Sequence, residues 1–195
     1  ALAVAGALGA LIVGCSGTGP DGERSATAPR EAPQSMRMVW FGNTNWHYQV
    51  GRIGILLDGE TKNDGKVDAA SVGKALATLR RTGTVDAILI GHEHIDHSVQ
   101  APEWARQTGK PVYAPAPVCA KLAAAGVPAA QCTALKGGER IALDADVSVH
   151  VVRWVHSVEC RELSKGSGGP ETFGFLITAN TGAGILNVYV YDSGA

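Results

Sequence analysis

The spacing of apolar residues in the first half of the chain alternates between strand and helix patterns. Short apolar runs that end in turn residues predict strands at 38–41, 47–50 and 52–57, followed by a buried strand at 85–90. Between the last two, apolar positions at helical spacing predict a helix that Asp68 caps and Gly83 closes. Shorter helices are expected at 102–108 and 118–125, with a strand at 111–114 between them.

From residue 132 onward the pattern is that of strands alone. Apolar runs predict strands at 132–135, 139–143, 147–155, 172–178 and 185–191. The turn sequence Lys136-Gly137-Gly138 predicts a hairpin between the first two of these strands. This order of elements indicates an α/β fold in which two sheets lie together with helices packed outside them.

The first 35 residues do not follow this pattern. Residues 1–14 are small and apolar, and they are too few to span a bilayer, which takes about 20 residues. With Cys15 directly after it, the run resembles the end of a bacterial signal peptide with a lipobox, while a buried apolar helix that ends at a cysteine is the alternative. Residues 16–35 are rich in Ser, Gly, Pro and Ala and predict a flexible tether. We expect a signal segment at 1–15, a tether at 16–35, and one domain at 36–195.

This organisation predicts a cellular location. A lipid on Cys15 would anchor the protein to a membrane on the periplasmic or extracellular side of a bacterial cell envelope. Disulfides can form in an exported protein. The spacing of Cys119 and Cys132 allows a bridge but cannot show it, and two ordinary buried thiols are the preferred interpretation.

Composition narrows the classes of partner. Charged residues make up 18% of the 195 residues and the formal net charge is −1, so the chain has no basic excess of the kind that binds nucleic acid. We therefore expect a small-molecule substrate and no nucleic-acid partner. The sequence does not predict an oligomeric state.

The segment Gly91-His92-Glu93-His94-Ile95-Asp96-His97 is the most informative part of the chain. It holds three of the six histidines and follows the apolar strand predicted at 85–90. Imidazole and carboxylate groups are good ligands for Zn²⁺ and similar ions. His92 and His94 are two residues apart and point the same way in an extended segment, whereas Asp96 and His97 follow where the chain turns and can face a second ion.

This segment resembles the H-x-H-x-D-H motif of the metallo-β-lactamase superfamily letter for letter. The resemblance covers residues 36–195 and implies an αββα sandwich with two metal ions at one edge. It implies His156 as the third histidine of the first ion, because His156 ends a strand and precedes Ser157 as in the lactonase-like branch. His150, in the middle of the same strand, is the competing histidine. The resemblance also implies that Asp192 bridges the two ions from an Asp-Ser-Gly turn.

Other positions follow from the same resemblance. The family has a last histidine on the second ion, and none is found after Asp192, so we expect a domain truncated at its C-terminus in a protein that continues beyond Ala195. Asp58 ends an early strand and is expected to orient a ligating histidine. His47 is a candidate for the mouth of the site. A turn aspartate and a strand histidine explain Asp58 and His47 equally well.

Together these features predict a metal-dependent hydrolase. Zinc is the expected metal, with two ions, and iron or manganese as alternatives. A hydroxide held by the metals would attack an ester, lactone, thioester or phosphodiester, and Asp96 would act as catalytic residue by holding the second ion and accepting a proton. An iron-dependent redox enzyme and a non-catalytic binding module on the same fold are the competing hypotheses.

Overall fold

The computed structural model describes residues 31–62, 64–157 and 169–190. The expected lipidation site Cys15 and the expected bridging ligand Asp192 lie outside the described residues, as does Cys160. Among the described residues, no helix is both long and apolar enough to cross a membrane.

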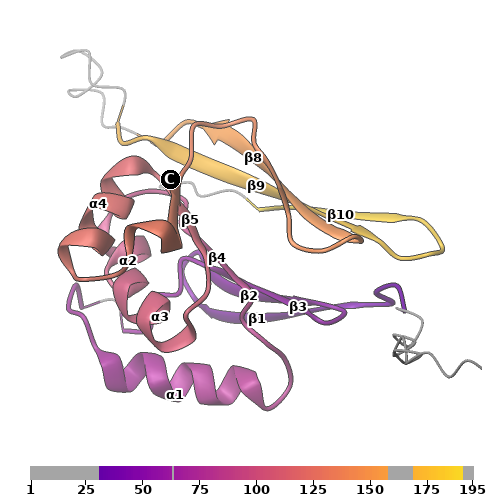
Figure 1. Cartoon of the computed structure of the whole chain (residues 1–195), viewed down its shortest axis with the longest axis horizontal. Helices are drawn as coiled ribbons and strands as arrows, with labels where there is room; N and C mark the ends of the chain where they lie inside the picture. The colour runs from indigo at the N-terminus through magenta and orange to yellow at the C-terminus, as the bar shows by residue number, and fades with distance from the viewer. Residues whose placement is uncertain (1–30, 63, 158–168, 191–195) are drawn as a thin grey trace, which may run out of the picture. The chain divides into compact units, whose positions relative to one another are not determined.

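The first sheet has six strands and contains both antiparallel and parallel strand pairs (Figure 1). Its strands, in spatial as well as chain order, are β1 (Met36–Gly42), β2 (Asn45–Val50), β3 (Ile53–Leu57), β4 (Ala87–Leu89), β5 (Val112–Ala114) and β6 (Cys132–Ala134). β1, β2 and β3 form an antiparallel meander, and β3 to β6 run parallel. Parallel neighbours require crossover connections, and the helices of the chain provide them.

The second sheet is antiparallel and has four strands. They are β7 (Arg140–Ala142), β8 (Val147–Trp154), β9 (Thr172–Asn180) and β10 (Ile185–Val190), in the order β10-β9-β8-β7. In Figure 1 the orange and yellow strands of this sheet lie over the purple strands of the first. Alternate residues of β8 and β9, such as Val149 and Phe175, are buried between the two sheets, as the period of two in a strand requires.

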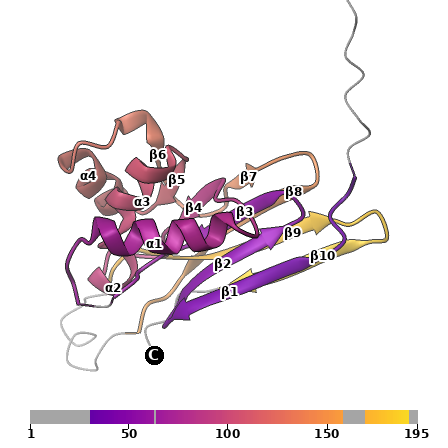
Figure 2. The same cartoon turned by 90° about the horizontal axis from the view of Figure 1, so that it is seen from below.

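The helices pack on the face of the six-stranded sheet that points away from the second sheet (Figure 2). They are α1 (Ala69–Arg80), α2 (Ile95–Ser98), α3 (Ala101–Thr108) and α4 (Ala116–Ala124), followed by a 3₁₀ turn at Ala129–Gln131. Asp68 caps α1 as predicted, since its carboxylate accepts a hydrogen bond from the Ser71 backbone amide at 2.8 Å. Trp104 of α3 is fully buried in the apolar core between these helices and the six-stranded sheet.

These layers confirm the predicted α/β class and the packing of two sheets with helices outside. Each face of the six-stranded sheet is covered, by the helices on one side and by the second sheet on the other. Within the described residues the helices cover only this sheet, so three of the four layers of an αββα sandwich are seen there.

The predicted hairpin at 136–138 is wrong. β6 pairs with β5 in the first sheet, whereas β7 pairs with β8 in the second. Lys136-Gly137-Gly138 therefore carries the chain from one sheet to the other. Glu139 holds this crossing by accepting hydrogen bonds from the Lys136 and Gly137 backbone amides, and the Gly138 amide donates to the Val151 carbonyl. A tight glycine turn between two apolar runs looks the same in a sequence whether or not the runs pair with each other.

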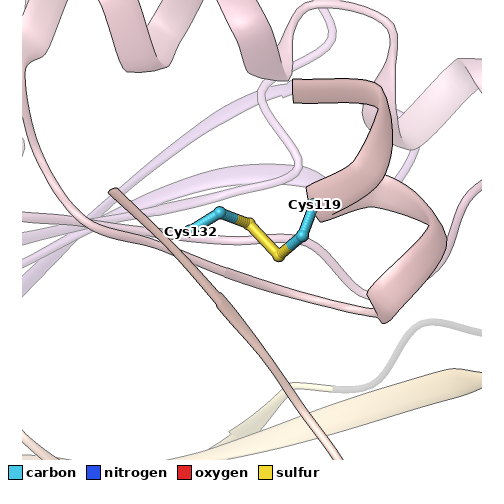
Figure 3. Close-up of a disulfide and its surroundings, with 2 residues drawn as sticks. All are labelled: Cys119 and Cys132. Carbon is cyan, nitrogen blue, oxygen red and sulfur yellow. A yellow bond between two sulfur atoms is a disulfide. The ribbon is translucent and has the colours of Figure 1, made fainter. Parts of the chain in front are cut away.

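A disulfide joins Cys119 of α4 to Cys132 at the start of β6 (Figure 3). The two cysteines are 13 residues apart, and their Cα atoms are 5.6 Å apart, within the range that a disulfide spans. The bridge therefore forms, and the alternative of two buried thiols is wrong. It fastens α4 to the edge of the six-stranded sheet, and Lys121 of the same helix contacts Glu93 of the histidine-rich segment.

Candidate metal centre

The histidine-rich segment begins where strand β4 ends. The Gly91 carbonyl accepts a hydrogen bond from the Phe173 amide of β9 at 2.9 Å, which ties the start of the segment to the second sheet. The segment then closes into the single turn α2, with His94 at its N-cap position. The Ser98 hydroxyl donates to the Glu93 and His94 carbonyls and fixes this turn. The side chains of the motif consequently leave a short backbone stretch in different directions.

One group of ligands consists of His92, His94 and His156. Each offers a ring nitrogen, and these nitrogens all lie within 4.8 Å of one another. The ring centroids are 4.5 Å apart for His92 and His94, 4.6 Å for His92 and His156, and 4.8 Å for His94 and His156. His156 comes from the segment after β8, so the two sheets each supply part of the group. The Nδ1 atom of His156 lies 2.5 Å from the Ser157 carbonyl, and a proton there leaves Nε2 available as a ligand.

A second group consists of His92, Asp96 and His97, whose ligand atoms also lie within 4.8 Å of one another. His97 is 4% exposed and its ring centroid is 4.0 Å from that of His92. Asp96 is half-buried, and its Oδ2 lies 3.4 Å from His97 Nε2. His92 belongs to both groups, so the two groups are adjacent.

Asp58 supports the second group from behind. This residue follows β3, is fully buried, and has a left-handed backbone with φ of 59°. Its Oδ1 accepts a hydrogen bond from the Gly91 amide at 2.9 Å, and its Oδ2 lies 2.9 Å from His97 Nδ1. With the proton of His97 on Nδ1, the carboxylate fixes the ring and leaves Nε2 to face Asp96. One carboxylate thus positions both the start of the segment and one of its histidines.

Two residues of the turn between β1 and β2 also support this group, and the sequence pattern did not predict them. The Thr44 hydroxyl lies 3.0 Å from His97 Nδ1 and donates to Asp58 Oδ2 at 3.3 Å. The Asn43 side-chain amide donates to Asp96 Oδ2 at 3.1 Å. Their contacts depend on how the turn packs against a segment about 50 residues away, and no local pattern signals that.

Lys121 of α4 is a third supporting residue that was not predicted. Its ammonium group donates to the Glu93 carbonyl at 2.9 Å and lies 3.3 Å from the Glu93 carboxylate. The helix that the disulfide fastens to β6 therefore also holds the backbone between His92 and His94.

The donor chemistry of these groups fits a divalent metal ion. Three imidazoles are the ligand set of a catalytic zinc with one open position, and a carboxylate with imidazole suits a second ion. Desolvation lowers the pKa of His94, and the neighbouring His92 and His156 lower it further. A lowered pKa keeps His94 neutral near pH 7, which is the form that binds a metal.

The other candidate histidines lie elsewhere. His150 sits on the exposed face of β8, opposite Arg140 and Leu176 of the neighbouring strands, and it does not join the ligand groups. His47 is not at the mouth of the site. It is fully buried on the helix-covered side of β2, where its Nε2 lies 2.7 Å from the Thr84 carbonyl. Strand alternation turns His47 away from the second sheet, and desolvation by burial lowers its pKa.

Comparison with known proteins agrees with this fold. Residues 67–190, which run from just before α1 to the end of β10, match the family described as the β-lactamase superfamily domain. The chain belongs to the β-lactamase superfamily. The matched residues include the whole of the histidine-rich segment and His156.

Curated proteins that resemble this chain share only about a quarter of their aligned residues with it. The chain is 28% identical over 122 residues to a UPF0173 metal-dependent hydrolase of Pyrobaculum calidifontis, a match over 63% of this chain and 51% of that protein. A protein of the same description from Pyrobaculum islandicum is 26% identical over the same shares. The chain thus spans about half the length of the curated relatives it matches.

Solved structures of the superfamily share the fold. Igni18, a metallo hydrolase from Ignicoccus hospitalis, has a TM-score of 0.55 at 20% identity, over 80% of this chain and 60% of that one. The Rm3 metallo-β-lactamase has a TM-score of 0.55 at 18% identity, over 84% and 61%. At these identities the likeness establishes the metallo-β-lactamase fold of the chain and nothing about its substrate.

Proposed function

We propose that the protein is a metal-dependent hydrolase with two metal ions, most simply zinc, bound side by side at the end of β4. The observation that carries this proposal is that two groups of three residues share His92, and in each group the three ligand atoms lie within 4.8 Å of one another. Isolated histidine clusters at a protein surface do not need a buried carboxylate behind them, whereas ligating histidines characteristically have one. The printed descriptions of the Pyrobaculum relatives as metal-dependent hydrolases also support this function.

The side chains have distinct roles in this proposal. His92, His94 and His156 would hold the first ion, and Asp96 and His97 would hold the second, while Asp192, outside the described residues, is the further ligand that the sequence suggests. Bound divalent ions supply a Lewis acid and lower the pKa of water toward about 7. Asp96 is the half-buried carboxylate of the site and accepts a proton during the reaction, while Asp58 and Thr44 keep the His97 ring in one orientation.

The substrate class we propose is a small molecule with an ester, lactone, thioester or phosphodiester bond. No serine or cysteine nucleophile is needed for such a reaction when metal ions activate water. Zinc β-lactamases generally lack a bridging aspartate, so the position of Asp192 in the sequence argues mildly against cleavage of β-lactams. The low net charge of −1 argues against RNA as the substrate.

Metal analysis combined with a hydrolysis panel tests this function. The purified protein should contain close to two zinc ions per chain and hydrolyse at least one of the four bond classes, and dialysis against a chelator should abolish the activity until zinc is restored. Iron with a visible absorption spectrum would point instead to the redox enzyme. Stoichiometric metal without hydrolysis of any of the four classes would favour the binding module.

We also propose that the protein works at the bacterial cell envelope, anchored by a lipid on Cys15. The disulfide between Cys119 and Cys132 supports an oxidising compartment, because such bonds are rare in the cytosol. Replacing Cys15 with Ser in the exported protein should move it from the membrane fraction to the soluble fraction. Membrane association that survives Cys15→Ser would contradict this anchor.

A further inference from the structure

A pocket lies between the two sheets, next to the ligand groups but separate from them. It has a volume of about 240 Å³ and is lined by residues of β2, β3 and β10 and of the turn between β1 and β2. The proposed hydrolysis does not use this pocket, and the chemistry of its walls indicates what it holds.

The walls of the pocket are aromatic and uncharged. Trp46 and Tyr48 lie on the side of β2 that faces the second sheet, with their rings 6.1 Å apart and nearly parallel at 22°. Leu57 is the register partner of Trp46, and Val190 of β10 packs from the facing sheet. Tyr189 also borders the pocket, but its ring packs against Trp154 on the outer face of the second sheet. Desolvation raises the pKa of Tyr48, and the charge of Asp58 raises it further, so this phenol stays neutral. The lining therefore favours a neutral, planar, apolar group.

The polar end of the pocket is directly connected to the candidate metal centre. Asn43 and Thr44 line the pocket and are the residues that bond Asp96 and His97. Only the side chains of Asn43 and Thr44 therefore separate a group in the pocket from Asp96 and His97 of the second ligand group. Asn43 therefore lies between the pocket and the carboxylate of Asp96.

We propose that this pocket binds a single-ring aromatic substituent of the substrate. This inference rests on the proposed hydrolase function and adds a substrate class to it, namely esters or lactones that carry an aryl group near the scissile bond. The size agrees, because a cavity of about 150 Å³ holds one benzene molecule and this open pocket has a volume of about 240 Å³. A linear alkyl chain would fill the same volume but would not stack on the Trp46 and Tyr48 rings.

Binding of phosphonates, which imitate the charge of a hydrolytic transition state, tests the pocket without requiring turnover. Isothermal titration calorimetry on the zinc-loaded protein would compare methyl-, n-butyl-, benzyl- and 2-phenylethylphosphonate. We expect at least one of the two aryl compounds to bind about tenfold more tightly than methylphosphonate, and n-butylphosphonate to gain less. In Trp46→Ala the aryl advantage should fall to about twofold, because the stacking surface is gone.

Two further variants keep the outcome decisive. Ile185→Ala removes a 70% exposed residue of β10 that is outside the pocket, so it should keep the full aryl advantage. Trp46→Leu retains apolar volume and replaces Trp46→Ala if circular dichroism shows that the latter is unfolded. Equal binding of all four phosphonates to the unaltered protein, or an aryl advantage that survives loss of Trp46, would overturn this inference alone. Failure of every phosphonate to bind would overturn the proposed function and the inference together.

Discussion

The two ligand groups share His92 but differ in how the chain holds them. His97 of the second group is buried, and Asp58 and Thr44 both contact its Nδ1. In the first group His94 is exposed, and His156 is half-buried and bonds the carbonyl of the residue that follows it. The second group is thus built into the interior of the domain, whereas the first is assembled from two strand ends at its rim.

This difference shows which contacts hold the candidate ligands in place. Asp58 connects β3, the start of the histidine-rich segment and His97 in one buried network, so the protein itself fixes the orientation of His97 in the second group. The first group depends on β8 delivering His156 to His92 and His94. We therefore expect substitutions in the two groups to differ in which ion is lost and in whether the stability of the fold changes.

His92→Ala should have the largest effect, because His92 belongs to both groups. Activity should disappear and the first ion should be lost, so that metal content falls by at least one ion per chain, as measured by plasma emission spectroscopy. The circular dichroism spectrum should stay unchanged, since the two apolar cores do not include this side chain. Retention of two tightly bound ions would show that the shared position is assigned wrongly.

His156→Ala should weaken only the first ion. Loss of a direct ligand should cost more than the roughly 10–100-fold in affinity that loss of a supporting partner costs. His150→Ala is the matched control, because it removes a histidine from the exposed face of β8, the strand that leads to His156. Zinc titrations that weaken equally in the two variants would contradict the selection of His156.

Asp58→Asn should weaken the second ion by about 10–100-fold, because His97 loses the carboxylate that fixes its ring. Asp86→Asn is the control for stability alone. Asp86 is a half-buried carboxylate that bonds the Gly54 amide and Lys110 away from the site. Asp86→Asn should lower the melting temperature and leave zinc affinity intact. An Asp58→Asn protein with normal zinc affinity would reduce Asp58 to a structural turn residue.

Thr44→Val should have the smallest effect. It removes one hydroxyl that contacts His97 Nδ1 and Asp58 Oδ2 but preserves the shape of the side chain. One hydrogen bond contributes about 0.5–1.5 kcal/mol, so the second ion should bind roughly 2–10-fold more weakly. Calorimetric titration of the two ions separates this change from the first site, which should be unaffected.

The comparison of the two groups also explains which site residues can be predicted from sequence. The motif from His92 to His97 is predictable because its residues are contiguous and follow an apolar strand. Asp58 was expected from the resemblance to the superfamily, and the structure brings it to the motif because β3 and β4 are parallel neighbours, so residues after their ends lie together. Asn43 and Thr44 are not, since an Asn-Thr turn is common and only the fold brings it to Asp96 and His97.

The wrong predictions have physical causes of the same kind. His47 is a candidate in the sequence because it is a histidine in an early strand, but the alternation of β2 places it on the helix-covered face. The hairpin at 136–138 is wrong because glycine turns carry no information about which strands pair. Long-range pairing is decided by the register of whole sheets, and short runs such as Cys132–Ala134 contain too few residues to specify it.

The bridge between Cys119 and Cys132 has a practical consequence for anyone preparing the protein. A loop of this length contributes on the order of 3 kcal/mol of stability, a large share of what a domain of this size has in total. Expression in a reducing cytosol, or purification with thiol reagents, would open this bond. Thiolates are also strong zinc ligands, so the same reagents would compete for the metal. A sample made in this way would be less stable and depleted of metal at once, and its lack of activity would say little about the enzyme.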